Sequence, residues 1–241
     1  MRRIHILTHR LLIVSFLIAL SLLAYAYLRH RPQDLPWTKI DLAQPVGFFT
    51  GRKLAALTKD PSQCRALLDR AGVAYHAMPP SGSGQCVRAD SLNLRPKEGD
   101  IRLAPVSVAP SCPVVAALKL WEWYVVQPAA WRIYGKPIRT IRHLGSFNCR
   151  RIYGRNQGRF SEHATADAID IAAFVTADGR SISVLKDWKG EDQDSRFLRA
   201  VRDGACGLFS TVLSPDYNAA HRDHLHLDQA ERGATGWRAC R

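Results

Sequence analysis

Residues 11–28 form an uninterrupted stretch without a charged side chain, and this stretch constrains the fold more than any other feature. Its eighteen residues reach the lower limit for a helix that spans a bilayer. Arg2, Arg3 and Arg10 precede it, so the positive-inside rule predicts a cytoplasmic N-terminus. Two interpretations stay open: a membrane anchor that ends at Arg29, or a secretory signal peptide cleaved near Ala26. Both send the rest of the chain out of the cytoplasm.

The chain divides into four predicted parts. Residues 1–10 are expected to be a cytoplasmic tail, 11–28 a transmembrane segment, 29–45 a linker, and 46–241 a single exported domain. Roughly 210 residues remain after the apolar stretch, which is enough for one domain with a sizeable core. A hydrophobic content of 46% argues against disorder. The oligomeric state does not follow from the sequence.

Six cysteines agree with export, because disulfides persist in oxidising compartments. None belongs to a Cys-x-x-Cys motif, so a zinc site built from cysteines is not expected. Many pairings are compatible with the sequence alone. Joining neighbours along the chain predicts the disulfides Cys64–Cys86, Cys112–Cys149 and Cys206–Cys240.

The chain is strongly basic, with a formal net charge of +13. Between Lys136 and Arg159 there are seven Lys or Arg residues and no acidic residue. A basic surface attracts polyanions, which outside the cytoplasm are cell-wall carboxylates, wall phosphates or anionic lipids. Nucleic acid is therefore not expected as a partner. The alternative is a solvated face that contributes only to solubility.

Helices and antiparallel strands are mixed without a regular strand–helix–strand alternation, which indicates an α+β fold. A small antiparallel sheet flanked by helices is expected. The predicted helices are one from Pro61 to Gly72 with Asp60 as N-cap, one that starts after Ser111 and ends before Pro128, and one capped by Asp194 or Ser195. The predicted strands are residues 138–147, 168–176, 182–188 and 224–228, of which the second and third form a hairpin.

Two clusters of polar residues carry metal-binding chemistry. Side chains alternate along a strand, so His224 and His226 are expected to point the same way. Upstream, Asp170 lies in an apolar strand, where a carboxylate is unfavourable unless it is paired or binds a cation. A structural salt bridge to an arginine is the alternative. His163 precedes the same strand and can reach the same ion, and three protein ligands with an open position are typical of catalytic zinc.

These clusters carry a resemblance to known proteins. Ser161-x-His163-x-x-Ala166-x-Ala168-x-Asp170 resembles the first motif of the zinc peptidases grouped as the lysostaphin/D-Ala-D-Ala peptidase/hedgehog superfamily, and His224-x-His226 resembles the second. From about residue 45 onward, the chain is similar to the bacterial extensin-like C-terminal domain family. The matching features are Cys149-Arg150, Ser161-Glu162-His163-Ala164, residues 168–171, Trp188, Pro215-Asp216-Tyr217-Asn218 and His221.

The resemblance implies a role for each matched residue. One zinc ion would be bound by His163, Asp170 and His226. His224 would act as general base or direct the attacking water. His221 matches a histidine of the penicillin-insensitive murein endopeptidases that helps to polarise the substrate. Arg150, or its neighbour Arg151, falls where related D-Ala-D-Ala peptidases have an arginine near the scissile carbonyl.

One position departs from the superfamily motif, which usually has glycine where this chain has Ala166. Either the methyl group narrows the approach to the metal, or the backbone here has a negative φ and does not need glycine. Asp228 is a second open position, since it either orients a ligand imidazole or is a surface charge.

The expected protein is a membrane-anchored zinc metallopeptidase of the bacterial envelope that cleaves an amide bond in peptidoglycan stem peptides or cross-links. It would lie in the inner membrane, with its N-terminus in the cytoplasm and its catalytic domain in the periplasm. The alternatives are an inactive zinc-containing module that binds the cell wall, a structural envelope protein whose histidines satisfy a core, and an enzyme with another substrate. Neither the bond cleaved nor endo- versus carboxypeptidase activity follows from the sequence.

Overall fold

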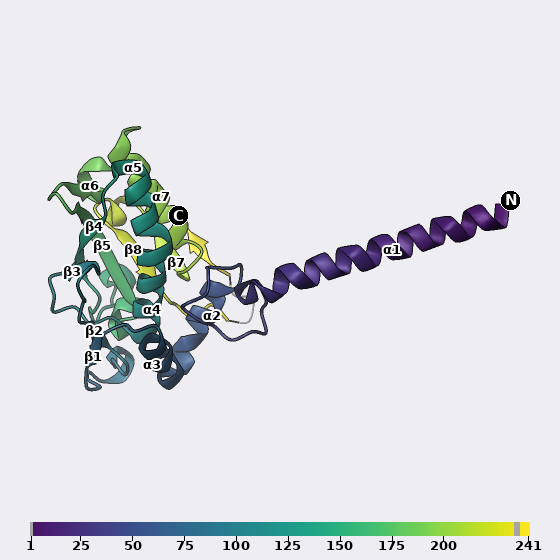
Figure 1. Cartoon of the computed structure of the whole chain (residues 1–241). Helices are drawn as coiled ribbons and strands as arrows, with labels where there is room; N and C mark the ends of the chain where they lie inside the picture. The colour runs from purple at the N-terminus through teal and green to yellow at the C-terminus, as the bar shows by residue number, and fades with distance from the viewer. Residues whose placement is uncertain (1, 234–236) are drawn as a thin grey trace.

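Figure 1 presents the fold as a computed structural model that describes residues 2–233 and 237–241. One long helix, α1 (Arg2–Arg29), projects from a rounded domain that contains the other elements. Within the described residues, its segment from His5 to Arg29 is the one helix long and apolar enough to cross a membrane, by length and composition. The helix continues without interruption from Arg2, so it includes most of the predicted cytoplasmic tail.

The strands of the domain are β1 (Tyr75–Ala77), β2 (Leu92–Leu94), β3 (Arg102–Ala104), β4 (Ile138–Gly145), β5 (Ala168–Thr176), β6 (Ser181–Ser183), β7 (Thr211–Leu213), β8 (Leu225–Asp228) and β9 (Ala239–Cys240). The main sheet has the order β3-β4-β5-β8-β7-β9, and β6 pairs with β5. Its inner pairs are antiparallel, whereas the pairs β3–β4 and β7–β9 at its two edges are parallel. Strands β1 and β2 form a separate antiparallel pair.

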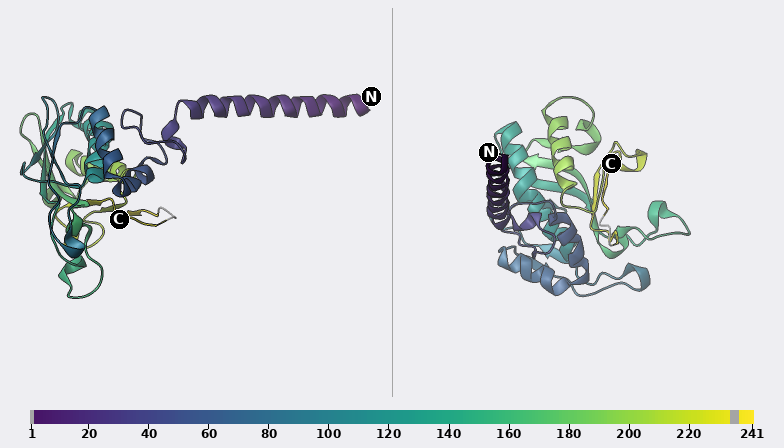
Figure 2. Two further views of the ribbon diagram at one scale, coloured as in Figure 1. Left: turned by 90° about the horizontal axis from the view of Figure 1, so that it is seen from below. Right: turned by 90° about the vertical axis from the view of Figure 1, so that its right-hand side faces the viewer.

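The helical segments of the domain are the α-helices α2 (Thr50–Ala56), α3 (Pro61–Arg70), α4 (Cys112–Trp121), α5 (Gln127–Tyr134), α6 (Val184–Asp187) and α7 (Gln193–Ala205), the π-helical turn η4 (Glu122–Val126), and the short turns η1 (Pro32–Asp34), η2 (Leu57–Lys59), η3 (Gly84–Cys86), η5 (Ile152–Gly154), η6 (Glu162–Thr165) and η7 (Ala219–His221). Figures 1 and 2 show α4, α5 and α7 over one face of the main sheet. Trp121 of α4 packs edge-on against Phe174 of β5, which in turn packs against Phe197 of α7. The mixture of helices and strands confirms the predicted α+β class.

Two predicted helix starts differ in accuracy. Asp60 caps α3 as predicted, because its side chain accepts a hydrogen bond from the Gln63 amide at 2.9 Å. The cap of α7 is Asp192, not Asp194 or Ser195, since the Asp192 side chain accepts from the Ser195 amide at 2.9 Å. Both residues are short carboxylates three positions before the amide that they bind, and this spacing identifies the cap.

Pro128 does not end the second helix, so that prediction was wrong. In a regular helix the proline ring would collide with the carbonyl of the residue four positions earlier. Here the π-helical turn η4 shifts the hydrogen-bond pattern just before Pro128, which then lies in the first turn of α5. The side chain of Gln127 exchanges two hydrogen bonds with the backbone of Ile138, so the continued helix is tied to the first residue of β4.

The predicted hairpin is confirmed only in part. Strand β5 has the expected bounds, but its partner β6 ends at Ser183 and residues 184–187 form the helical turn α6. The Ser183 amide donates to Asp187 Oδ2 at 2.7 Å, which closes the turn and ends the strand.

The predicted linker over residues 29–45 is also partly wrong. Ile40 and Leu42 are buried in the hydrophobic core, with 5% and 1% of their surface exposed. The chain therefore joins the domain well before residue 46, because burying these two apolar side chains stabilises the folded domain more than leaving them exposed in a free linker would.

Two of the three predicted disulfides were wrong. The bonds are Cys64–Cys112, Cys86–Cys149 and Cys206–Cys240, so only the last agrees with the prediction. Pairing by chain order failed because the core brings α3 against the start of α4, where Cys64 and Cys112 are both fully buried. The paired Cα atoms are 6.1, 5.5 and 5.6 Å apart, within the range that disulfides require.

Candidate metal centre

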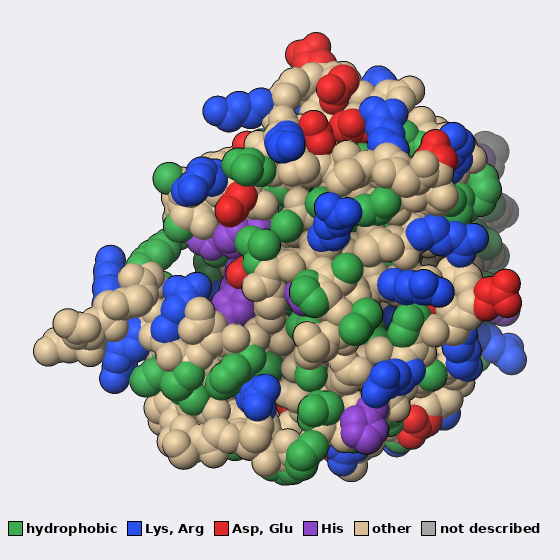
Figure 3. Space-filling model, turned by 90° about the vertical axis from the view of Figure 1, so that its left-hand side faces the viewer, with side chains coloured by type: hydrophobic (Ala, Val, Ile, Leu, Met, Phe, Trp, Pro, Cys, Tyr) green, Lys and Arg blue, Asp and Glu red, His purple; other side chains and the backbone are tan. Residues whose placement is uncertain are grey.

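The antiparallel pair β5–β8 brings the two predicted clusters together. Its register places Asp170 directly opposite His226, and His224 lies one residue before β8. Figure 3 shows histidine side chains lining a hollow in the left half of the face turned away from α1, with Lys and Arg side chains around it. The structure thus brings together residues that are more than 50 positions apart in the chain.

Three ligand atoms converge at this point, one each from His163, Asp170 and His226. Nε2 of His163 is 3.2 Å from Oδ1 of Asp170, and Nδ1 of His226 is 3.0 Å from the same oxygen. The two imidazole nitrogens are 3.1 Å apart. Donors bound tetrahedrally to zinc are separated by about 3.3 Å. The spacing therefore fits a zinc ion after a small outward movement.

The outer nitrogen of each imidazole is engaged by an acceptor. Nδ1 of His163 donates to the Ser146 carbonyl at 3.1 Å, and Nε2 of His226 donates to Asp228 Oδ2 at 3.1 Å. In a neutral imidazole only one nitrogen carries a proton. The inner nitrogens are then unprotonated and face each other and a carboxylate, so three lone-pair donors meet at one point. Such a set is stable when a cation joins it.

The electrostatics of the cluster also favour a cation. Burial alone would raise the pKa of Asp170, but when the inner nitrogens of His163 and His226 carry protons instead of facing a metal ion, their hydrogen bonds hold it well below its usual range. Burial alone would lower the pKa of His226, whereas its hydrogen bonds to Asp170 and Asp228 raise it to about 9. The carboxylates that favour a proton on His226 favour a metal ion in the same place, and metal binding would release that proton.

The turn η6 orients His163 through local contacts. Ser161 caps the turn by accepting a hydrogen bond from the His163 amide, and the His163 carbonyl accepts one from the Asn148 amide at 2.9 Å. The turn ends at Ala166, whose φ of +63° lies in the left-handed region. The interpretation with a negative φ at Ala166 was therefore wrong. Ala166 is fully buried and does not line the cavity over the cluster, so its methyl group does not narrow the approach to it.

His224 and His221 lie beside the cluster. Nε2 of His224 is 3.6 Å from Asp170 Oδ1, and its Nδ1 is 2.8 Å from Asp223 Oδ1. His221 lies on η7, with Nδ1 at 2.8 Å from Asn218 Oδ1. Burial, together with repulsion from the other histidines, lowers the pKa of His221 to about 4. His221 is thus neutral at neutral pH.

A cavity of about 570 Å³ lies over the cluster. Arg150 lines it, whereas Arg151 does not: its guanidinium stacks on Phe160, 4.4 Å from the ring centroid, and donates to the Gly158 carbonyl. Of the two predicted arginines, Arg150 is therefore the one available to a ligand. The cavity is also lined by residues to which the sequence had not pointed as ligand contacts, among them Tyr153, Arg159, Tyr217, Arg232 and Trp237.

One of the cavity residues that the sequence analysis missed, Tyr153, stands out in the structure by its backbone conformation. Tyr153 has a φ of +57°, and its hydroxyl accepts from Asn218 Nδ2 at 3.0 Å. A tyrosine in the left-handed region is unfavourable, and such outliers gather at functional sites. The following Gly154 hints at a tight turn in the local sequence, but it does not reveal which residue adopts the unusual conformation.

Comparison with known proteins supports the assignment of the domain. Residues 62–241 match the family described as extensin-like protein C-terminus. No curated protein and no solved structure shows significant similarity to the chain. The match covers both clusters of candidate metal ligands and all six cysteines, and it begins within α3.

Proposed function

The chain belongs to the extensin-like protein C-terminus family, and from that membership and the site geometry we propose that it is a zinc-dependent hydrolase. The proposed hydrolase would be similar to the zinc peptidases of the lysostaphin/D-Ala-D-Ala peptidase/hedgehog superfamily. Its substrate would be an amide bond in a peptidoglycan stem peptide or cross-link. The observation that carries the proposal is the convergence of His163 Nε2, Asp170 Oδ1 and His226 Nδ1 within hydrogen-bond distance of one another.

The ligand set favours zinc over calcium or magnesium, because two of the three donors are imidazole nitrogens. Three protein ligands leave a position open, as in catalytic zinc sites. A zinc ion held there would lower the pKa of water and polarise an amide carbonyl. The outer hydrogen bonds to Ser146 and Asp228 keep both imidazoles in the orientation that binding requires.

The neighbouring side chains fit the remaining roles in amide hydrolysis. His224 holds its Nε2 toward the cluster and its Nδ1 against Asp223, so it can take a proton at Nε2 while the carboxylate stabilises the resulting charge. Neutral His221 and cationic Arg150 border the same cavity, where hydrogen bonds to a developing oxyanion would be strong.

The N-terminal helix supports a substrate outside the cytoplasm. A membrane-spanning α1 with its basic N-terminus in the cytoplasm would leave the domain in the periplasm, where peptidoglycan lies. Three disulfides fit that compartment. The arginines around the cavity fit the carboxylates of peptidoglycan stem peptides.

A digest of cross-linked peptidoglycan tests the function. The zinc-loaded full chain should convert one cross-linked muropeptide into smaller products, and a chelator should prevent it. His224→Ala should keep its zinc and lose activity by at least about a hundredfold, as expected for loss of a general base. His76→Ala, which removes an exposed histidine outside the cavity, is the matched control and should remain active.

The outcomes separate the alternatives. A folded chain that holds one zinc but yields no product would exclude the peptidase and favour the module that binds cell wall without cutting it. Full activity in His224→Ala would remove His224 from the mechanism. A folded chain without zinc would favour the structural role, in which the histidines satisfy the core.

A further inference from the structure

The segment that follows α1 is fastened to α2 rather than free. Nζ of Lys53 donates to the carbonyl of Pro32 at 3.1 Å and to Thr38 Oγ1 at 2.8 Å. The Phe48 amide donates to Asp34 Oδ1 at 2.7 Å. Figure 1 shows α2 on the side of the domain from which α1 leaves. These contacts hold residues 32–48, the segment that follows α1, against α2. We call the surface formed by this segment and α2 the α1 face.

Large aromatic side chains of the α1 face point into solvent. Trp37 is 77% exposed and Phe48 is 80% exposed, although both belong to segments held by the hydrogen bonds above. A third aromatic, Trp237, is 58% exposed and lies between this face and the cavity over the histidines, because it lines both that cavity and the smaller one beside Gly51. Aromatic side chains with this exposure are typical of the boundary between a bilayer and water.

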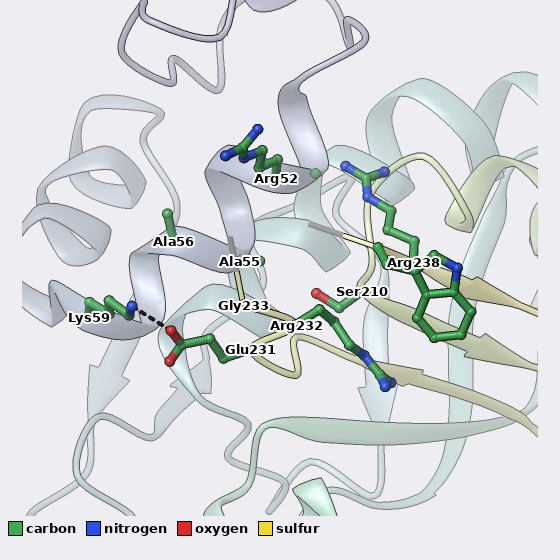
Figure 4. Close-up of a pocket in the computed structure, with 11 residues that line it drawn as sticks. Arg52, Ala55, Ala56, Lys59, Ser210, Glu231, Arg232, Gly233 and Arg238 are labelled. Carbon is green, nitrogen blue, oxygen red and sulfur yellow. Dashed lines mark ion pairs between the residues drawn. The ribbon is translucent and has the colours of Figure 1, made fainter. Parts of the chain in front are cut away.

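Cationic side chains accompany these aromatics. Residues 29–59 contain six Lys or Arg residues and two Asp residues. Figure 4 shows a cavity of about 130 Å³ between α2 and the C-terminal segment, lined by Arg52, Lys59, Arg232 and Arg238. Glu231, the acidic residue in the cavity wall, pairs with Lys59. The cavity therefore keeps an excess of positive charge.

The arginines of this cavity differ in direction. In Figure 4 the guanidinium groups of Arg52 and Arg238 point to the same side, whereas Arg232 points the other way, where it donates to Thr211. Arg238 is held by two carbonyls, those of Cys206 and Gly207, and a side chain on Gly51 would collide with it. Arg238 is thus a fixed charge beside exposed Arg52.

We propose that the α1 face binds the surface of an anionic bilayer, namely the one that α1 enters. Trp37 and Phe48 enter the interfacial region, and Arg52, Lys59 and Arg238 bind the phosphate of an anionic phospholipid headgroup. The charge complementarity and the covalent attachment to α1 identify the occupant as lipid. The hollow lined by histidines opens on the face turned away from α1, so docking leaves it free (Figure 3).

The test uses the full chain in nanodiscs of phosphatidylcholine, with or without phosphatidylglycerol, and lipids brominated near the headgroup. None of the six tryptophans lies in α1, so quenching of tryptophan fluorescence reports on the domain alone. Quenching should be strong in the anionic discs and weak in the neutral ones. Trp37→Phe should remove much of it, whereas Trp131→Phe, on α5, should not.

Charge variants test the headgroup contact. For the double variant Arg52→Gln/Lys59→Gln, the ratio of docked to undocked domain should fall roughly fivefold for each cation removed. Arg102→Gln, an exposed arginine on β3 at the far edge of the sheet, is the control and should dock as the unaltered chain does. Equal circular dichroism spectra and the same three disulfides establish that each variant is folded.

Three results would overturn the proposal. Equal quenching in neutral and anionic discs excludes recognition of anionic lipid. Quenching that survives Trp37→Phe and the double charge variant excludes the α1 face. Inorganic phosphate that binds the cavity without reducing docking shows that the cavity takes free phosphate instead of a headgroup.

Discussion

The acceptors around His163 and His226 determine which ring nitrogen of each residue faces the cluster. A backbone carbonyl takes the Nδ1 proton of His163, and a carboxylate takes the Nε2 proton of His226. The two histidines therefore present different nitrogens to the same point. The family resemblance implies both histidines as ligands, but it does not reveal the nitrogen that each uses, because Ser146 lies 17 residues from His163.

Asp228→Asn should weaken zinc binding roughly 10–100-fold. The amide of asparagine has nearly the size of the carboxylate, but it carries no negative charge and therefore holds the His226 ring less firmly. Competition with a coloured chelator measures the affinity. Asp223→Asn is the matched control, since Asp223 contacts His224 and not a ligand of the cluster, and it should leave the affinity unchanged. Equal affinities in both variants would contradict a role of Asp228 in orienting His226.

Asp167 makes stability depend on pH. Burial, opposed by the hydrogen bond from Ser111, raises its pKa to about 7. A raised pKa in the folded state means that the protonated form is favoured there, so its stabilising contribution is complete below about pH 4 and is lost as the pH rises to about 7.

Asp167→Asn should therefore stabilise the metal-free chain at pH 8, by up to about 4 kcal/mol, and should have little effect at pH 4. Denaturant unfolding at the two pH values measures the difference. Asp178→Asn, at an exposed position, is the control and should not reproduce this pattern. A gain in stability that is equal at both pH values would contradict the account.

At the scale of elements, β5 and β8 were predictable because each carries a periodic pattern with turn residues around it. Their pairing then follows from the histidine and aspartate that face each other. The turn η4 was not predictable, since Pro128 normally breaks a helix and nothing local reveals a π-helical turn. Val125 of η4 packs against Gly204 of α7, and this contact favours the continued helix.

Gly204→Ala tests this packing. In an isolated helix the change stabilises by about 1 kcal/mol, but here the new methyl would overlap the side chain of Val125. We expect unfolding free energy to fall by about 1–3 kcal/mol. Adding Val125→Ala should recover part of the loss, because it removes the overlap. Chemical denaturation of the two single variants and the double variant measures this coupling. A stabilising Gly204→Ala would contradict the observed contact.

For the whole molecule, the sequence predicts export, the α+β class and the residues of the candidate centre. It does not predict the partners of Cys64 and Cys86, because those contacts join segments 48 and 63 residues apart. The same limit applies to Ile40 and Leu42, whose burial depends on a core assembled from distant segments. Local patterns identify elements and side chains, whereas the closed tertiary structure decides which of them meet.

The central claim is that His163, Asp170 and His226 together bind one zinc ion, and calorimetric zinc titration of the metal-stripped full chain tests it most directly. The account predicts one zinc per chain, and an affinity that falls at least about 100-fold in Asp170→Ala but not in Asp178→Ala, which removes an exposed carboxylate outside the cavity. A folded chain that binds no zinc, or an Asp170→Ala variant with unchanged affinity, would contradict it.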